Sequence, residues 1–272
     1  MPELPEVETI ARGLAKRVAG DVIESVWLGS KPEPLKSSAA DIEEALHSKK
    51  ILNVRRSGKH IVFDLGKSGR SSGAESAQWI VHLGMTGQLL VCAADSEVAK
   101  HTHAVLRLVS GRELRFIDPR RFGRLAVLEN FTPPGSEPLT ISAADFMALF
   151  RARKTPIKSA LLNQKLLSGV GNIYADEALY RAGVRPRRRA ASLTTDEFRR
   201  LHRALRQVLS EAIRLGGSSI SDYVDSDGRE GFFQLKHRVY GREGQPCRRC
   251  ATAIKRLVIA GRSSHYCPQC QT

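Results

Sequence analysis

Two cysteine pairs near the C-terminal end constrain the fold of this chain more than any other feature. Cys247-x-x-Cys250 and Cys267-x-x-Cys270 lie within the last 26 of 272 residues, with 16 residues between the pairs. Paired thiolates at this spacing suit tetrahedral zinc, whereas disulfides rarely persist in a reducing compartment. The spacing therefore predicts a small C-terminal finger that folds around one structural zinc ion.

Upstream of the cysteines, the chain changes from a strand texture to a helical one near residue 130. Between residues 51 and 128, short and partly alternating apolar runs are separated by Gly-containing turns, which is typical of an antiparallel sandwich or barrel. The Ser- and Gly-rich stretch Lys67–Ser76 predicts a surface loop. We expect seven strands, at Ile51–Arg56, His60–Leu65, Gln78–Leu83, Gln88–Cys92, Ala104–Val109, Arg112–Ile117 and Arg124–Leu128.

Helical periodicity flanks these strands on both sides. The first predicted helix, Pro5–Val18, carries apolar residues at helical spacing and ends before Gly20. Three prolines in Asn130–Pro138 predict a linker after the last strand. The other predicted helices are Ala39–His47, Phe146–Arg151, Pro156–Asn163, Asn172–Ala182 and Asp196–Leu215, and a polar loop, residues 218–231, follows the last of them.

The charge balance predicts the chemistry of the partner. The chain has 43 basic and 28 acidic residues, so its net charge is 43 − 28 = +15. An excess of this size indicates a polyanionic partner. No apolar stretch is long enough for a membrane span, and no export signal is visible. We therefore expect a cytoplasmic, nucleoid-associated protein that binds nucleic acid and no membrane.

The first residues predict covalent chemistry. Proline after Met1 permits removal of the methionine, which would leave Pro2 with a free secondary amine. An α-amino group has a pKa of about 7.7–8, so part of it is neutral at physiological pH. Such an amine can attack an electrophilic carbon while Glu3 and Glu6 move protons. The alternative is an ordinary frayed terminus followed by Pro5 at the start of a helix.

Two loops between strands could enter a base stack. The loop Asp118-Pro-Arg120-Arg-Phe122-Gly places an arginine next to an aromatic residue, and Met85 lies in a second loop. Apolar side chains can wedge between bases and arginine can hydrogen-bond a base edge. The alternative for the first loop is a β-turn with a solvated arginine and a buried phenylalanine.

A glycine-rich turn precedes one of the predicted helices. In Gly169-Val-Gly171-Asn172-Ile-Tyr, backbone N–H groups at the helix start could bind a phosphate, with Asn172 as an added donor. An ordinary tight turn is the alternative. Basic residues nearby favour binding to a nucleic-acid backbone; they are Arg151, Arg153, Lys154 and Lys158.

These motifs, in this order, resemble bacterial formamidopyrimidine-DNA glycosylases over essentially the whole chain. The resemblance implies an α+β protein that acts as a monomer on damaged double-stranded DNA bound in a cleft. It implies an N-terminal antiparallel β-sandwich with the catalytic residues at 2–130. A helix–two-turn–helix domain would follow at 131–235, and a zinc finger at 236–272. The implied activity is excision of oxidised purines, such as 8-oxoguanine and formamidopyrimidines, followed by strand cleavage through β,δ-elimination.

The resemblance also implies roles for individual residues. Pro2 would be the nucleophile on C1′ of the damaged nucleoside, Glu3 the acid–base group, and Glu6 the support of the terminus. Lys59 would assist β-elimination, and Arg262 on the finger would contact phosphate and assist δ-elimination.

Further positions would bind the DNA itself. The hole left by the flipped nucleotide would be filled by Met85, Arg120 and Phe122, with Arg120 also a DNA-binding residue. Backbone contacts would come from His101, Arg153, Lys158 and Asn172. Some relatives carry a lysine where this chain has Ser221, so the base contacts of the 218–231 loop stay open.

Two other interpretations explain part of the sequence. An endonuclease VIII-like glycosylase for oxidised pyrimidines would share the fold and the nucleophile, but it typically begins Pro-Glu-Gly-Pro and lacks the Arg-Phe loop. A non-catalytic zinc-ribbon protein would explain the charge and the cysteines but not the Pro2-Glu3 pair.

Overall fold

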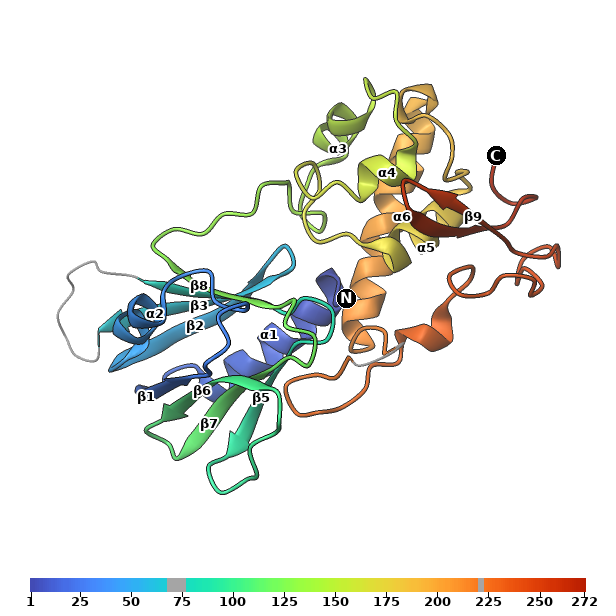
Figure 1. Ribbon diagram of the computed structural model, residues 1–272. Coiled ribbons are helices and arrows are strands. Elements are labelled where there is room, and N and C mark those ends of the chain that lie inside the picture. Colours follow the sequence, from blue (N-terminus) through green and yellow to red (C-terminus); the bar gives the residue numbers. More distant parts are fainter. Residues whose placement is uncertain (68–76, 220–222) are drawn as a thin grey trace. The chain divides into compact units, whose positions relative to one another are not determined.

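The computed structural model describes residues 1–67, 77–219 and 223–272 (Figure 1). Most of the predicted loop Lys67–Ser76, and also Ser221, lie outside these residues. The chain forms two compact units. The first consists of Met1–Thr132 and Gly216–Gly231, and the second of Pro133–Leu215 and Phe232–Thr272.

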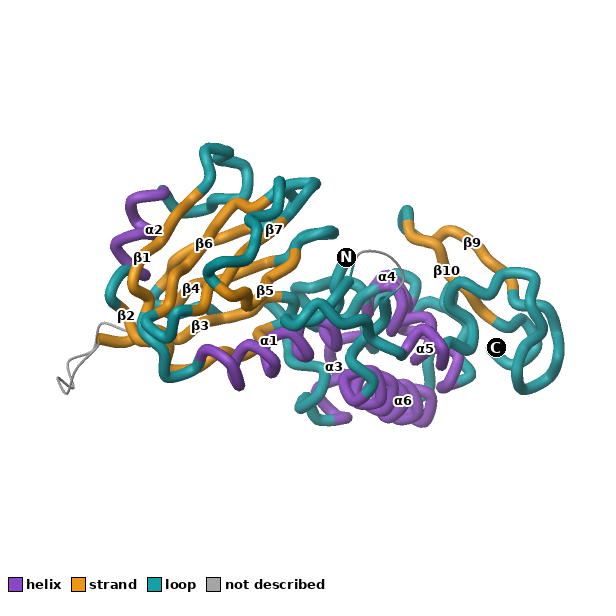
Figure 2. Tube along the Cα trace, turned by 90° about the horizontal axis from the view of Figure 1, so that it is seen from below, coloured by secondary structure: helices purple, strands orange, loops and turns teal. Residues whose placement is uncertain are grey.

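The first unit contains two four-stranded antiparallel sheets that share one hydrophobic core (Figure 2). One sheet has the order β1-β6-β7-β5 and the other β2-β3-β4-β8. Their strands are β1 (Ile23–Leu28), β2 (Lys49–Ser57), β3 (His60–Lys67), β4 (Gln78–His82), β5 (Gln88–Ala93), β6 (Thr102–Leu108), β7 (Arg112–Ile117) and β8 (Arg124–Leu128).

Two helices accompany these sheets, α1 (Leu4–Val18) and α2 (Ala39–Leu46). Helix α1 packs on β2, β3 and β5, and therefore contacts both sheets. Its apolar stripe enters the shared core through Val7, Ile10, Ala11, Leu14 and Val18. This burial fixes the start of α1, and with it the N-terminal residues, against the sandwich.

The second unit contains the remaining helices and the cysteine-rich segment. Its helices are α3 (Ala143–Phe150), α4 (Ile157–Leu161), α5 (Asn172–Ala182) and α6 (Thr195–Arg214), with short 3₁₀ turns at Ala190–Ser192 and Phe233–Lys236. Helix α6 packs against α5 and α3. Strands β9 (Lys255–Ile259) and β10 (Arg262–Tyr266) form an antiparallel hairpin near the C-terminus.

The predicted fold class is confirmed, since antiparallel sheets, a helical segment and a four-cysteine finger follow one another. All seven predicted strands are present, and sequence reasoning missed β1 in the sandwich and β9 and β10 in the finger. Strand β1 lies at a sheet edge, has a register shift between Ile23 and Ser25, and buries Ile23 alone. A mostly exposed edge strand lacks the apolar alternation by which strands are recognised. Among the described helices, none has the length and apolar character that crossing a membrane requires.

Candidate active site

The N-terminal residues form a buried acidic corner at the start of α1. Glu3 is the N-cap residue, and only 5% of its surface and 2% of that of Glu6 are exposed. The Glu3 N–H donates to Oε2 of Glu6 at 2.8 Å. Pro2 is buried directly beside this pair, whereas Met1 is exposed. The structure thus places Pro2, Glu3 and Glu6 in one small region, as the sequence suggested.

A distant segment holds the second oxygen of Glu6. The Ser218 N–H donates to Oε1 of Glu6 at 2.8 Å. Gly217 has a φ of 83°, and a Cβ there would lie 2.9 Å from Cγ of Glu6, so a larger residue does not fit. Tyr223 donates to the Gly216 carbonyl at 3.0 Å, and burial raises the pKa of its phenol, which keeps this donor protonated. Residues 216–231 therefore pack with the sandwich as part of the first compact unit.

Lys59 lies in the two-residue turn of the β2–β3 hairpin. Gly58 supplies the left-handed backbone at φ 61°, and Lys59 is 8% exposed. Arg56, just before the turn, donates to a carboxylate oxygen of Glu8 at 2.7 Å. This ion pair links the hairpin to α1, which carries Glu3 and Glu6.

Asp118 joins the two loops that could enter a base stack. It is fully buried, and its Oδ1 accepts from the Thr86 hydroxyl at 2.6 Å and from the Arg120 N–H at 3.2 Å. Its Oδ2 accepts from the Gly123 N–H at 2.7 Å. One carboxylate thereby fixes the Met85 loop against the Arg120–Phe122 loop, a role that the sequence analysis did not assign.

The loop tips present apolar and cationic groups to solvent. Met85 is 42% exposed and Phe122 is 53% exposed. The Arg120 guanidinium carbon lies 4.8 Å from the centre of the Phe122 ring. The loops approach closely because Gly84 has no side chain, and a Cβ there would lie 2.5 Å from the backbone of Gly123. The structure therefore brings the three predicted hole-filling residues together, and Phe122 is not a core residue.

Next to these loops is a pocket of about 340 Å³, lined in part by Met1, Met85 and Phe122. Its wall includes His60 and His82, whose ring centres are 5.0 Å apart. Burial lowers the pKa of both imidazoles, and that of His82 reaches about 4, with further contributions from His60, Lys59 and Arg124. The Gly84 N–H lies 3.2 Å from Nδ1 of His82, which accepts this hydrogen bond in the neutral ring.

This neutral histidine predicts acid sensitivity. Because the folded-state pKa of His82 lies below 6.5, the unfolded chain binds more protons than the folded one between pH 6.5 and 4. The free energy of unfolding therefore decreases as the pH is lowered through that window. The full effect is at most about 3 kcal/mol. In His82→Gln, the free energy of unfolding should depend less on pH in this range, as measured by urea titration. The exposed His47→Gln should behave like the wild type, and an equal slope in His82→Gln would contradict the assignment.

In the second unit, Asn172 is the first residue of α5, after Gly171 as the N-cap. Gly169 supplies a φ of 95° in the preceding turn. The Gln164 side chain holds this turn, because it donates to the Val170 carbonyl at 2.8 Å and accepts from the Gly169 N–H at 2.9 Å. The predicted phosphate-binding turn is therefore held by the Gln164 side chain between α4 and α5.

Lys158 is fully buried rather than at the surface. Its Nζ forms an ion pair with Oδ1 of Asp176 at 2.7 Å. It also donates to the Ser263 carbonyl at 2.6 Å and to the Ser264 hydroxyl at 2.8 Å. In this arrangement Lys158 fastens α4 and α5 to the finger hairpin, and its contact with DNA stays a prediction.

The remaining predicted DNA contacts are at the surface of their own units. His101 is exposed directly before β6, and its carbonyl accepts from the Asp118 N–H at 2.9 Å. Arg153 is exposed after α3 and donates to the Leu149 carbonyl at 2.7 Å. Arg262 is exposed at the first position of β10, after a turn in which Ala260 and Gly261 both have positive φ.

The four cysteines of the finger converge as a metal site. Their sulfur atoms all lie within 4.8 Å of one another. The Sγ distances are 3.5 Å for Cys250–Cys267 and 3.9 Å for Cys247–Cys270. Four thiolates at about 2.3 Å from a tetrahedral zinc ion would be about 3.8 Å apart, so the site fits one zinc ion. The Tyr180 hydroxyl on α5 lies 3.3 Å from Sγ of Cys247 and ties the site to the helices.

Comparison with known proteins assigns these features to one family. The Formamidopyrimidine-DNA glycosylase N-terminal domain matches residues 1–125, and the Formamidopyrimidine-DNA glycosylase H2TH domain matches residues 134–224. The zinc finger found in FPG and IleRS matches residues 244–272. The formamidopyrimidine-DNA glycosylase of Solibacter usitatus (strain Ellin6076) is 46% identical, over 100% of this chain and 99% of its own. The chain belongs to the formamidopyrimidine-DNA glycosylase family.

Solved structures of this family have the same fold. The Fpg crystal structure from Thermus thermophilus is 43% identical, with a TM-score of 0.85 and coverage of 99% of this chain and 98% of that one. A complex between the Lactococcus lactis Fpg and an abasic site containing DNA is 32% identical, with a TM-score of 0.88 and 99% coverage of both chains. This protein is therefore a DNA glycosylase of base-excision repair with a structural zinc finger.

Within the formamidopyrimidine-DNA glycosylase fold, two features escaped sequence reasoning. The sequence places Asp118 at the start of a loop, and the neighbouring residues do not predict that its side chain is buried. The hydrogen bond from Ser218 to Glu6 spans 212 positions of sequence. The one local signal is the Gly216-Gly217 pair, and two glycines directly after Leu215 suit an ordinary helix end equally well.

Proposed function

We propose that this glycosylase excises oxidised purines from duplex DNA and then cleaves the strand by β,δ-elimination through a Schiff base on Pro2. The observation that carries this proposal is the buried corner formed by Pro2, Glu3 and Glu6 at the start of α1. Glu6 is held at both oxygens by N–H donors from Glu3 and Ser218. Such a clamp orients a terminal amine against an acid–base group, and a frayed terminus would not need one.

The chemistry follows from the residue types. The Pro2 nitrogen forms a bond to C1′ while the bond from C1′ to the base breaks, and the base leaves with the electron pair and takes up a proton. Opening of the sugar with proton transfer by Glu3 gives a cationic iminium, which a secondary amine forms without a further proton. The cation acidifies C2′, and loss of a C2′ proton expels the 3′ phosphate. Loss of the C4′ proton from the unsaturated iminium that results then expels the 5′ phosphate. We assign assistance of the first elimination to Lys59, and contact with the phosphate and assistance of the second elimination to Arg262.

Access to the base requires that the nucleotide leave the stack. Enzymes that act on a base in duplex DNA extrude it, and the vacated space must then be filled. We assign this filling to Met85, Arg120 and Phe122, whose exposed side chains lie on the two loops that Asp118 joins. Contacts to the DNA backbone are assigned to His101, Arg153, Lys158 and Asn172.

Covalent trapping tests the proposed nucleophile. With borohydride and a duplex that contains an abasic site, the protein that begins at Pro2 should form a stable covalent adduct. A form that retains Met1, made by cell-free synthesis with the methionine aminopeptidase inhibited, should be trapped far less, because the Pro2 nitrogen is then an amide and the terminal amine lies one residue away from the acidic corner. Pro2→Gly keeps a terminal amine and should still be trapped. Undiminished trapping of the Met1 form would overturn the assignment.

Arg120 should set the preference for the base opposite the lesion. Arginine offers only donors, so it pairs best with an edge rich in acceptors, and cytosine presents O2 and N3 whereas adenine presents N1 beside an N–H donor. An oxidised guanine opposite cytosine should be released faster than one opposite adenine, and Arg120→Ala should lose this preference. Single-turnover excision from matched duplexes measures both effects.

Arg121→Ala is the matched control for this experiment. Arg121 is the next residue in the same loop, and its guanidinium pairs with Glu33 at 2.6 Å. That variant should keep the preference for cytosine. If wild type has no such preference, or if Arg120→Ala retains it, Arg120 does not contact the orphaned base.

A further inference from the structure

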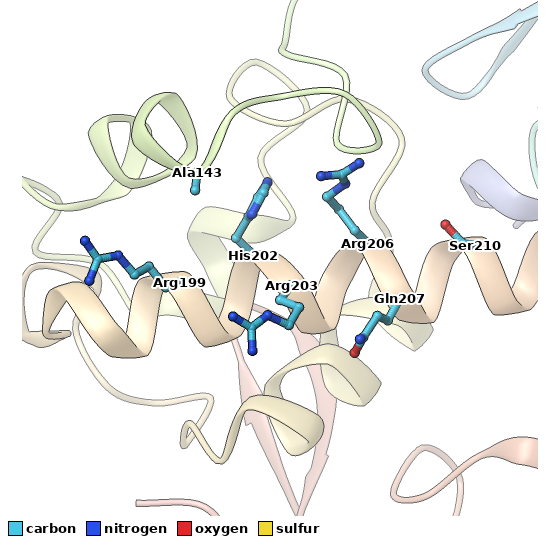
Figure 3. Close-up of a pocket in the computed structure, with 7 residues that line it drawn as sticks. All are labelled: Ala143, Arg199, His202, Arg203, Arg206, Gln207 and Ser210. Carbon is cyan, nitrogen blue, oxygen red and sulfur yellow. The ribbon is translucent and has the colours of Figure 1, made fainter.

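Helix α6 carries a row of cations that the assigned chemistry does not use. Arg199, Arg203 and Arg206 follow one another at spacings of four and three residues, so they share one side of the helix (Figure 3). Gln207 and Ser210 extend the row, and these five exposed residues are called the α6 basic face. From Arg199 to Ser210 it measures roughly 16 Å along the helix axis.

The α6 basic face lines a depression of about 560 Å³. Ala143, the first residue of α3, and His202 complete its lining, and no carboxylate contributes to it. The His202 ring nitrogen Nε2 lies 2.9 Å from the Ile141 carbonyl, which fixes the connection before α3 against α6. Arginines therefore line a hollow that borders the first turn of α3, a turn that carries Asp145.

Two of these arginines lack the partners that other arginines of the region have. Arg188 forms an ion pair with Glu197, and Arg181 forms one with Glu211. Both of these glutamates are on α6. Arg199 pairs with the exposed Asp196, at 3.0 Å. Within the described part of the chain, neither Arg203 nor Arg206 forms an ion pair. Like charges at this helical spacing oppose folding, so the row indicates an external anion.

The composition of the lining favours phosphate over an acidic protein surface. Protein interfaces combine arginine with large apolar or aromatic anchors, and this lining has its arginines but only Ala143 as an apolar residue. Arginine, glutamine, serine and helix N-termini are the groups that contact phosphates in DNA complexes. A face of about 16 Å matches the axial length over which one strand of B-DNA presents about five phosphates.

We propose that the α6 basic face is a second DNA-binding surface, which holds the phosphodiester backbone of a duplex segment other than the one under repair. Its residues are separate from all those assigned to the lesion, which lie at the N-terminus, in the sandwich loops, near α4 and α5, and on the finger hairpin. One protein molecule would then contact two duplex segments at once.

Bridging of two duplexes tests this surface on the full-length protein. A short duplex with a tetrahydrofuran abasic analogue is tethered and saturated with protein, and an undamaged labelled duplex is then added at a series of salt concentrations. The wild-type complex should capture the second duplex. In Arg203→Gln/Arg206→Gln, capture should weaken about tenfold or more, and the slope of log K against log salt should become shallower by about two.

The control variant is Lys16→Gln/Lys31→Gln, which removes the same charge from exposed positions of the first unit. It should capture the second duplex as wild type does. Excision from a short damaged duplex should be unchanged in both variants. This result would confirm that both variants fold and that the substitutions do not affect the repair site.

Three outcomes would overturn the proposal. The first is that the saturated wild-type complex captures no second duplex. The second is that Arg203→Gln/Arg206→Gln captures the second duplex with unchanged affinity and salt slope, or that the affinity of the control variant for this duplex falls by the same factor. The third is that polyglutamate binds in an Arg203- and Arg206-dependent manner while the duplex does not, which would make this a surface for an acidic protein.

Discussion

Exchange of Glu3 for glutamine should slow the release of a damaged base by about 10²- to 10⁴-fold, the usual contribution of a positioned acid–base group. Glutamine has nearly the same shape, so it should preserve the N-cap position at the start of α1. It cannot exchange the proton that sugar opening and base departure require. At an abasic site made beforehand, the base has already left, and Glu3→Gln should still cleave the strand to a substantial extent.

Single-turnover kinetics on two duplexes, one with the damaged base and one with the abasic site, separate these steps. Glu43→Gln is a suitable control, because Glu43 is exposed on α2 and distant in sequence from the corner. Glu6→Gln should differ from both, since an amide can present only one oxygen to the two N–H donors that Glu6 now satisfies. Full base release by Glu3→Gln would remove Glu3 from its assigned role.

Loss of zinc should have the second large effect. Cys267 is fully buried, and structural zinc contributes about 10–16 kcal/mol of binding free energy in zinc-finger peptides, so Cys267→Ser should lose both the ion and the folded finger. The hairpin that carries Arg262 would then lose its support. We expect DNA affinity to fall by about 10²-fold, since each hydrogen bond to a charged group contributes about 1.5–3 kcal/mol.

Metal analysis together with DNA titration measures this effect. The chain supplies its own control in Cys92, which lies on β5, apart from the four clustered thiols, and is only partly buried. Cys92→Ser should retain one zinc ion per chain and wild-type affinity. Active protein that contains no zinc would contradict the structural role of the ion.

The parts of the fold that could be predicted from sequence are those with a local signature. Helix α5 begins at Asn172 and ends at Ala182, as glycines at both ends predicted, and the zinc site follows from cysteine spacing. Strand β1 escaped because a mostly exposed edge strand has no apolar alternation. The position of each catalytic candidate near the N-terminus could also be predicted, since Pro2, Glu3 and Glu6 are neighbours in sequence.

Long-range contacts between polar groups could not be predicted in this way. A lysine that binds phosphate and a lysine buried against Asp176 have the same identity and similar neighbours, so only the structure shows the ion pair of Lys158. The same holds for Asp118, whose carboxylate takes donors from two loops. Both groups lie in interiors formed by several elements, and no local pattern encodes such burial.

The hydrogen bond from Ser218 to Glu6 has a consequence for the order in which the protein becomes functional during synthesis. A ribosome makes residues 1–132 first, and domains commonly begin to fold as they emerge. The nascent sandwich nevertheless lacks the donor of Ser218 and the close fit of Gly217 until more than eighty further residues, Pro133–Leu215, have been added. The acidic corner is therefore completed late, and a fragment that ends at Thr132 should hold Glu6 less firmly than the finished chain does.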